Sequence, residues 1–173
     1  RITDLLKEKY NVDILIPKSF MIATQKDDFV WLRREAERFS QGIMFWEYPY
    51  TDTIAFNYDR LIEIRDSITK KYIPGPSEGS YMKIAMIEPP EDKRLSFNGH
   101  FAVEMRGLWE LEGDFMGGPF VSYTLVDEAR NRVVTVDGFV YNPSQEKKDL
   151  LRQIEALLYT LNFPGDEDAT TMK

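Results

Sequence analysis

Hydrophobic residues recur at helical spacing in three stretches of the chain. The first stretch begins at the N-terminus and places Ile2 and Leu6 on one side. The second starts after Asn57, a typical N-terminal cap, and stops before Pro74, so we expect a helix from Tyr58 to Tyr72. The third stretch has the strongest apolar pattern.

This third stretch also has the clearest start signal. Asn142, Pro143 and Gln145 fit a cap, a first helical position and the partner of a capping box. We therefore expect a helix from Ser144 to Leu161. Its apolar side comprises Leu150, Leu151, Ile154, Leu157, Leu158 and Leu161.

Between these stretches lie short runs that alternate apolar and polar residues or are rich in β-branched and aromatic residues, as strands are. We expect strands at Val12 to Ile16, Phe20 to Thr24, Phe29 to Ala36, Ile43 to Tyr48, Tyr81 to Ile87, His100 to Leu111, Pro119 to Val126 and Val133 to Tyr141. Their connections are short and rich in turn residues, which favours hairpins and antiparallel pairing.

The order of these elements predicts an α+β fold: a twisted antiparallel sheet with the helices Tyr58 to Tyr72 and Ser144 to Leu161 packed on one face. A weak internal duplication is compatible with the pattern. Trp46 to Pro49 leads into one helix much as Phe139 to Pro143 leads into the other. Ordinary alternation of strands and helices explains the same pattern.

The composition fits one globular domain. Of the 173 residues, 43% are hydrophobic and 29% charged, which is too apolar for intrinsic disorder. A domain of this size buries roughly 70% of the surface of its unfolded chain, so its core needs no metal or disulfide. We expect a single domain over residues 1–164 and a flexible acidic tail over residues 165–173.

Several classes of chemistry are disfavoured. The absence of cysteine removes thiol nucleophiles and Cys-based zinc sites, and the only histidine, His100, follows an Asn-Gly turn and should be an exposed residue at the start of a strand. Common phosphate-binding glycine motifs do not occur. A net charge of −7 without a basic run argues against nucleic-acid binding. We expect no cofactor, no metal and no catalytic residue of these types.

The most unusual segment runs from His100 to Phe120. On a strand Glu104 and Arg106 point to one face, while Met105 and Trp109 point to the other. Glu104 and Arg106 could orient a polar ligand or simply form an ion pair. Trp31, Trp46 and Trp109 all lie in strand patterns. Most of the aromatic residues should lie in the core, and the rest could form a binding patch on the sheet surface.

The glycine-rich loop after this strand is the second candidate. Gly117 and Gly118 could expose backbone N–H groups to a ligand, or could supply the positive φ of a hairpin turn, which we expect at one of them. Asp114 lies in the same loop. Candidate binding residues are therefore Glu104, Arg106, Trp109, Asp114, Gly117 and Gly118. Pairs of carboxylates for glycosidic acid–base chemistry could come from Glu104, Glu110, Glu112 and Asp114.

Several ordered motifs resemble an uncharacterised family, a domain of unknown function found in predicted envelope lipoproteins of Gram-negative anaerobic bacteria. The motifs are E-x-R-G-L-W at Glu104 to Trp109, G-D-F-M-G-G-P-F at Gly113 to Phe120, N-R-V-V-T-V at Asn131 to Val136, F-V-Y-N-P at Phe139 to Pro143 and E-A-L-L-Y-T-L at Glu155 to Leu161. The resemblance implies that the chain is the C-terminal part of a longer protein, held in the cell envelope by a lipid outside it.

The residues and the resemblance together predict a non-enzymatic module of the cell envelope that binds an envelope protein or glycan. The membrane would be reached only through the lipid anchor. The competing interpretation is a carboxylate-dependent hydrolase acting on a glycan, which requires two carboxyl groups facing each other across a cleft. The family supplies no activity that would decide between them.

Overall fold

The computed structural model describes residues 1–143 and 147–166. These residues form three α-helices, eight strands and two short 3-10 segments, at Thr53–Phe56 and Glu128–Arg130. The helices are α1 (Ile2–Tyr10), α2 (Tyr58–Tyr72) and α3 (Lys147–Leu158). The strands are β1 (Met21–Gln25), β2 (Phe29–Glu35), β3 (Ser40–Pro49), β4 (Tyr81–Ile84), β5 (Glu91–Phe97), β6 (His100–Glu112), β7 (Gly117–Asp127) and β8 (Arg132–Tyr141).

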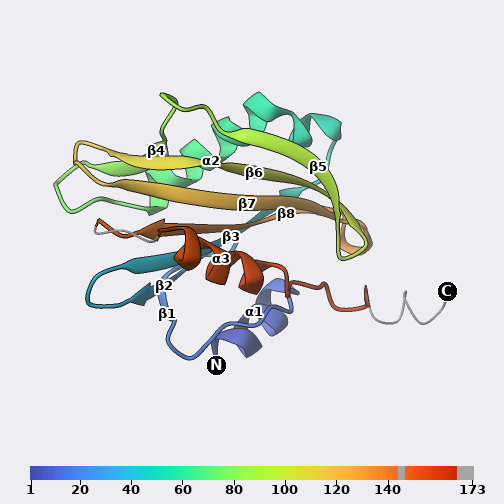
Figure 1. Ribbon diagram of the computed structural model, residues 1–173. Helices are drawn as coiled ribbons and strands as arrows, with labels where there is room; N and C mark the ends of the chain where they lie inside the picture. Colours follow the sequence, from blue (N-terminus) through green and yellow to red (C-terminus); the bar gives the residue numbers. More distant parts are fainter. Residues whose placement is uncertain (144–146, 167–173) are drawn as a thin grey trace.

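All eight strands belong to one curled antiparallel sheet, which confirms the predicted α+β class. The strand order is β1-β2-β3-β8-β7-β6-β4 (Figure 1). Strand β6 is long enough to take two partners on its outer side, because its first half pairs with β5 and its last four residues pair with β4. The central strands β3, β8 and β7 therefore join the two halves of the sheet.

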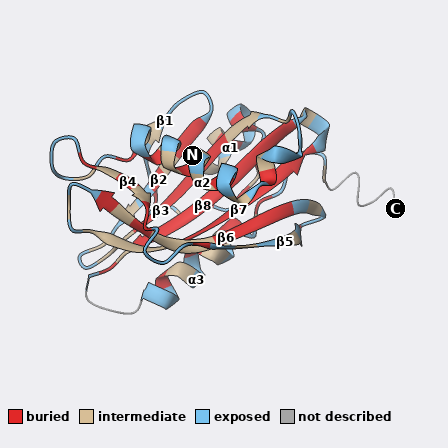
Figure 2. Ribbon diagram, turned by 90° about the horizontal axis from the view of Figure 1, so that it is seen from above, coloured by how far each residue is buried: buried red, intermediate tan, exposed pale blue. Residues whose placement is uncertain are grey.

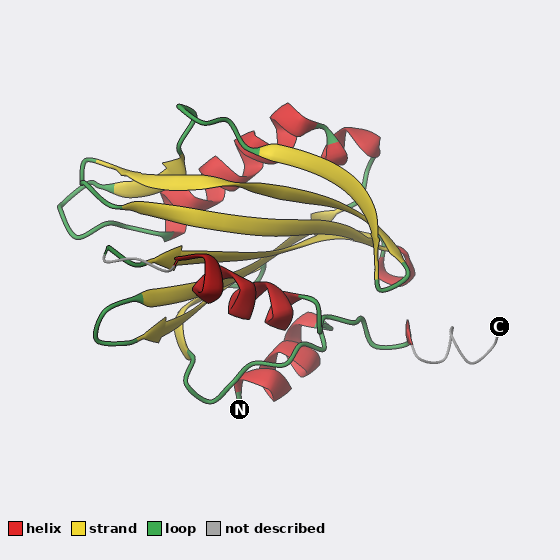
Figure 3. Cartoon of the chain, viewed as in Figure 1, coloured by secondary structure: helices red, strands yellow, loops and turns green. Residues whose placement is uncertain are grey.

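The two long helices lie on opposite faces of the sheet, so the prediction that they share one face is wrong. Helix α2 covers one face, and α1 and α3 cover the other (Figures 1 and 3). The reason is visible in β8, whose residues are buried from Arg132 to Val140 (Figure 2). Val134 and Val136 pack toward α3, whereas Val133 and Phe139 pack toward α2. A strand buried on both faces needs a covering layer on each.

Helix α2 begins as the sequence predicts, with Asn57 Oδ1 accepting a hydrogen bond from the Asp59 backbone N–H at 3.0 Å. Its buried side is unusually polar, since Arg65 and Thr69 are buried along with Leu61. Thr69 donates a hydrogen bond to the Met82 carbonyl oxygen at 2.9 Å. Polar contacts therefore add to the apolar packing that ties α2 to the sheet.

Two strand predictions differ from the structure. Residues Val12 to Ile16 form no strand, and only Asp13 makes an isolated bridge, to Asn162. Their alternation reflects Val12, Ile14 and Ile16 packing into the α3 side of the core rather than ladder pairing. Strand β5 was not predicted, because its polar residues are mostly exposed and carry no apolar alternation. The Asn98-Gly99 turn, with positive φ at both residues, brings β5 against β6.

Helix α3 is present as predicted but ends earlier, since it is described over Lys147–Leu158 and the prediction extended to Leu161. Of the predicted start signals, Asn142 and Pro143 lie before the described helix, and Gln145 lies outside the described residues. Of the predicted tail, Gly165 and Asp166 are described, and residues 167–173 are not. The two segments that suggested a duplication lie on the neighbouring strands β3 and β8.

The hairpin between β6 and β7 places its left-handed residue elsewhere than predicted. Gly113 has a φ of 94°, whereas Gly117 and Gly118 do not have positive φ and belong to β7. The expectation of positive φ at Gly117 or Gly118 is therefore wrong, because the chain turns at the start of the loop. Gly118 is instead needed for space, since a Cβ there would overlap the Val140 carbonyl oxygen and meet Trp109 Nε1 at 3.2 Å.

We predict that Gly118→Ala destabilises the domain through this overlap, although its φ is ordinary. The indole of Trp109 crosses Gly118 to donate a hydrogen bond to the Val140 carbonyl oxygen at 3.2 Å, and a methyl group would separate these atoms. We expect a loss of about 1–3 kcal/mol in the free energy of unfolding, measured by denaturant titration. Gly99→Ala is the control for backbone strain without crowding, because its Cβ would meet nothing within 4 Å. An unchanged stability in Gly118→Ala would contradict this account.

We predict that Ile154→Ala lowers the free energy of unfolding by about 2–5 kcal/mol, because Ile154 is fully buried and faces Gly138 of β8. Leu151, one turn earlier, is only partly buried, and Leu151→Ala should cost clearly less. Equal losses in the two variants, measured by chemical denaturation, would show that α3 packs through a different side.

Candidate functional site

The six candidate binding residues do not form one site. Glu104 and Arg106 face α3, where Arg106 pairs with both Glu104 and Glu155. Trp109 points to the opposite face and packs in the α2 side of the core. The alternation of β6 thus holds as predicted, but it separates these residues by the thickness of the sheet.

Glu104 and Arg106 form the ion pair that the sequence suggested, within a larger cluster. Arg106 Nε lies 3.0 Å from Glu104 Oε1, and Arg106 also pairs with Glu155 of α3. The Tyr123 hydroxyl lies 3.0 Å from Glu104 Oε2 and 2.9 Å from Glu155 Oε1. Every group in this α3-side cluster therefore has a partner, which is the arrangement of a structural ion network.

The electrostatics of the α3-side cluster also favour a structural role. Burial raises the pKa of the Tyr123 hydroxyl, and the nearby Glu104 and Glu155 carboxylates raise it further. Burial lowers the pKa of Arg106, but hydrogen bonds to both carboxylates outweigh this and raise it overall. Tyr123 thus stays neutral and Arg106 stays charged. Neither group is poised to exchange a proton near neutral pH.

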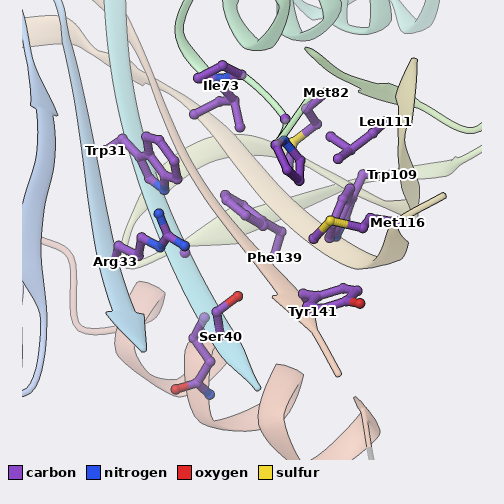
Figure 4. A pocket seen from close by; sticks show the side chains of 15 residues that line it. Trp31, Arg33, Ser40, Ile73, Met82, Trp109, Leu111, Met116, Phe139 and Tyr141 are labelled. Atoms are coloured by element: carbon purple, nitrogen blue, oxygen red, sulfur yellow. The ribbon is translucent and has the colours of Figure 1, made fainter. Parts of the chain in front are cut away.

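A hollow on the α2 side of the sheet is the best candidate site. This aromatic pocket has a volume of about 400 Å³ and opens near the ends of β2, β3 and β8 (Figure 4). Its lining comes from five strands, β2, β3, β4, β6 and β8, and from two turns at the rim. The lining residues are Trp31, Arg33, Ser40, Gln41, Gly42, Ile73, Pro74, Gly75, Pro76, Met82, Trp109, Leu111, Met116, Phe139 and Tyr141.

Aromatic rings form much of the wall of the aromatic pocket. Phe139 lies at its centre, with its ring centroid 5.8 Å from Trp109 and 6.5 Å from Trp31 (Figure 4). Tyr141, two residues further along β8, lies 6.3 Å from Trp109. Because residues two apart on a strand share a face, Phe139 and Tyr141 both point into the pocket side. Gly42 leaves room for the Phe139 ring, which a Cβ at Gly42 would overlap.

The rim of the aromatic pocket is held by Asp114, another of the predicted residues. Asp114 Oδ2 accepts a hydrogen bond from the Ser77 backbone N–H at 3.0 Å, and Oδ1 accepts one from the Ser77 hydroxyl. These hydrogen bonds lower the pKa of the Asp114 carboxyl group. The carboxylate therefore fastens the turn at Pro74 to Pro76 against the loop that carries Met116.

Three of the six predicted residues thus contribute to the aromatic pocket, one as a lining residue and two by supporting it. Trp109 lines it, Asp114 fixes its rim, and Gly118 gives Trp109 its place. Sequence reasoning missed Trp31, Phe139 and Tyr141. A signal was present in the sequence, because Trp31 and Arg33, like Phe139 and Tyr141, are two residues apart and so share one face of a strand. It could not show that β2 and β8 line the same pocket, because they are brought together only by pairing with β3.

His100 is not the exposed residue that the sequence predicted. Its side chain is only 13% exposed, with Nδ1 lying 3.0 Å from Glu128 and Nε2 lying 3.0 Å from Asp166. Phe163 packs against the ring in an edge-on geometry. Partial burial lowers the pKa of His100, but the hydrogen bonds and charges of Asp166 and Glu128 outweigh it and raise the pKa overall.

The described part of the chain has neither a metal-binding cluster nor a membrane-spanning helix. Among residues 1–143 and 147–166, no group of three or more His, Cys, Asp or Glu side chains could hold a metal ion. No helix within these residues is long and apolar enough to cross a membrane.

We predict a pH dependence of stability from His100. Because its folded-state pKa lies above the unfolded value of about 6.5, its contribution is complete below that pH and is lost as the pH rises through the folded pKa. The wild-type chain should therefore lose more unfolding free energy than His100→Gln between about pH 6 and pH 8. Denaturant titrations of both proteins across this range measure the difference. Parallel curves would mean that the two carboxylates do not stabilise the imidazolium.

Comparison with known proteins supports the fold and gives a family. No curated protein sequence matches the chain significantly. Among solved structures, a mutant of the protein Mog1 is similar, with a TM-score of 0.51 over 88% of this chain and 90% of that chain, at 10% sequence identity. Such a low identity shows the Mog1-like α+β fold alone. The model of DUF4837, a domain of unknown function, matches residues 1–160. The chain therefore belongs to the DUF4837 family.

Proposed function

We propose that this domain is a non-enzymatic binding module that takes an apolar part of its ligand into the aromatic pocket. The observation that carries the proposal is the pocket itself, whose volume of about 400 Å³ lies in the range of ligand sites. Twelve of its fifteen lining residues are apolar, aromatic or glycine. Binding pockets for small molecules are usually lined in this way, by many apolar side chains and a few polar groups.

The lining favours an apolar group over a sugar. The polar lining residues are Arg33, Ser40 and Gln41, and the Gln41 amide already donates a hydrogen bond to the Leu150 carbonyl oxygen at 2.9 Å. A buried sugar brings many hydroxyl groups, each of which costs free energy unless it finds a partner. Of the two partner classes expected from the sequence, the aromatic pocket therefore fits a protein side chain or another apolar group better than a glycan.

The hydrolase alternative has less support. Glu104 is bound within the α3-side cluster, whereas Asp114 holds the Ser77 turn next to the aromatic pocket. Glu110 and Glu112 both pair with Lys83. Glycosidase chemistry needs two carboxyl groups about 5–10 Å apart on either side of one bond, inside a cleft. None of these four carboxylates lines the aromatic pocket.

The cell-envelope setting remains part of the proposal. Its support is the set of sequence motifs from Glu104 to Leu161, which resemble predicted lipoproteins. In that setting the aromatic pocket would meet components of the envelope, and a lipid outside this chain would hold the module near the membrane.

We predict that Met116→Arg weakens the binding of the neutral apolar dye Nile red by at least about tenfold, because it places a charge among the apolar side chains that line the pocket. Fluorescence titration measures the affinity. Met21→Arg is the matched control, since Met21 is 72% exposed on β1 and does not line the pocket. Thermal melts of the three proteins establish that each one is folded. Equal dye affinities would place the apolar binding site elsewhere.

Enzyme assays provide the opposing outcome. The purified chain should show no turnover of glycoside, ester or peptide substrates. Turnover that disappears in Glu104→Gln or Asp114→Asn would replace the binding proposal by the hydrolase.

A further inference from the structure

The aromatic pocket has a polar end and an apolar end. Trp31, Arg33 and Ser40, from β2 and β3, lie along one side (Figure 4). Met82, Leu111 and Met116 lie on the opposite side, with Phe139 between the two groups (Figure 4). A ligand that matched both ends would be an amphiphile, with its apolar body toward Met116 and its polar head toward Arg33.

Arg33 determines the charge that the head group needs. It is the only charged side chain among the described residues that line the aromatic pocket. Its Nε pairs with Glu35, and the structure gives its two terminal nitrogens no hydrogen bond within the described residues. The Arg33 and Glu35 side chains are about half exposed, so their ion pair is weak. The guanidinium therefore keeps N–H groups for an anion.

Neighbouring groups at the polar end are also hydrogen-bond donors. The Trp31 indole nitrogen is buried beside Arg33 and has no hydrogen-bond partner among the described residues. An indole N–H can only donate, and the Ser40 hydroxyl can donate as well. A head group that accepts several hydrogen bonds would satisfy this end, whereas an ammonium head group would not.

The aromatic rings alone would suit a cage for a cation, as in sites that bind quaternary ammonium groups. The charge in the aromatic pocket favours an anion instead. Among the described residues no carboxylate lines the pocket, and Arg33 would repel a positive ligand. A single guanidinium, partly paired with Glu35, also suits one negative charge better than two.

We propose that the aromatic pocket binds an amphiphilic monocarboxylate, with the carboxylate at Arg33 and Ser40 and the apolar chain along Phe139 toward Met116. This inference rests on the proposed function, because it names the ligand class of the same pocket. Carboxylate and guanidinium are both planar and form paired charge-assisted hydrogen bonds. The apolar chain contributes by leaving water.

The test compares decanoate with decanol, which share a chain and differ in the head group. Both are titrated below the micellar range into the 173-residue chain, with the intrinsic tryptophan fluorescence as the signal, because two of the three tryptophans, Trp31 and Trp109, line the pocket. Decanoate should bind about tenfold more tightly than decanol. Arg33→Gln should remove this difference, because it weakens decanoate much more than decanol.

Glu35→Gln provides a variant with the opposite expected sign. Removing the carboxylate that competes for Arg33 should raise the affinity for decanoate roughly two- to fivefold and leave decanol unaffected. Met116→Arg should weaken both ligands, whereas Met21→Arg should weaken neither. Both residues of the ion pair are half exposed, so these variants should fold, and thermal melts verify this.

The outcomes separate this inference from the proposed function. Equal affinities for decanoate and decanol, or an acid preference that survives Arg33→Gln, would overturn the monocarboxylate and leave an apolar binding pocket. If neither decanoate nor decanol bound, while Nile red bound and Met116→Arg weakened it, the monocarboxylate would likewise be overturned and an apolar binding pocket would remain. If Nile red also failed to bind, the proposed function itself would fall.

Discussion

The buried ion pair between Arg65 and Asp137 is the interaction that positions α2 and, through it, the aromatic pocket. Arg65 Nε lies 2.8 Å from Asp137 Oδ2, both side chains are buried, and the guanidinium stacks 3.9 Å from the ring centroid of Phe120. Burial raises the pKa of the Asp137 carboxyl group, and the Arg65 charge opposes this. Leaving one such charge without its partner costs about 3–5 kcal/mol, so α2 has essentially one place to dock. The turn that follows α2, from Ile73 to Pro76, then forms part of the rim of the aromatic pocket.

The sheet is a single layer of strands, and it separates two different environments. On the α3 side the ion pairs of Arg106 with Glu104 and Glu155 tie α3 to β6, and the Tyr123 hydroxyl ties Glu155 to β7. On the α2 side the same strands contribute apolar and aromatic side chains to a core and an open pocket. Both faces thus hold ion pairs, and the α2 face also holds the aromatic pocket.

The Mog1-like fold by itself gives no function, since unrelated functions share folds and a 10% identity carries no site residues. Membership of DUF4837 likewise adds no activity. The proposed function therefore rests on the pocket and on Arg33, whose positive charge favours an amphiphile with an anionic head group over a purely apolar ligand. The family motif at Glu104 to Trp109 reaches the pocket only through Trp109.

Local patterns were enough to predict most of the elements. The cap at Asn57, the apolar stripe of α3 and the alternation of β6 depend on neighbours in sequence, and each was read correctly. Which face a helix covers depends instead on long-range packing, so the sequence could not place α2 and α3 on opposite sides. The aromatic pocket likewise needs Trp31, Trp109 and Phe139 to meet, and they come from β2, β6 and β8. Only strand order and register bring such distant residues together, because no local periodicity encodes contact between strands far apart in the chain.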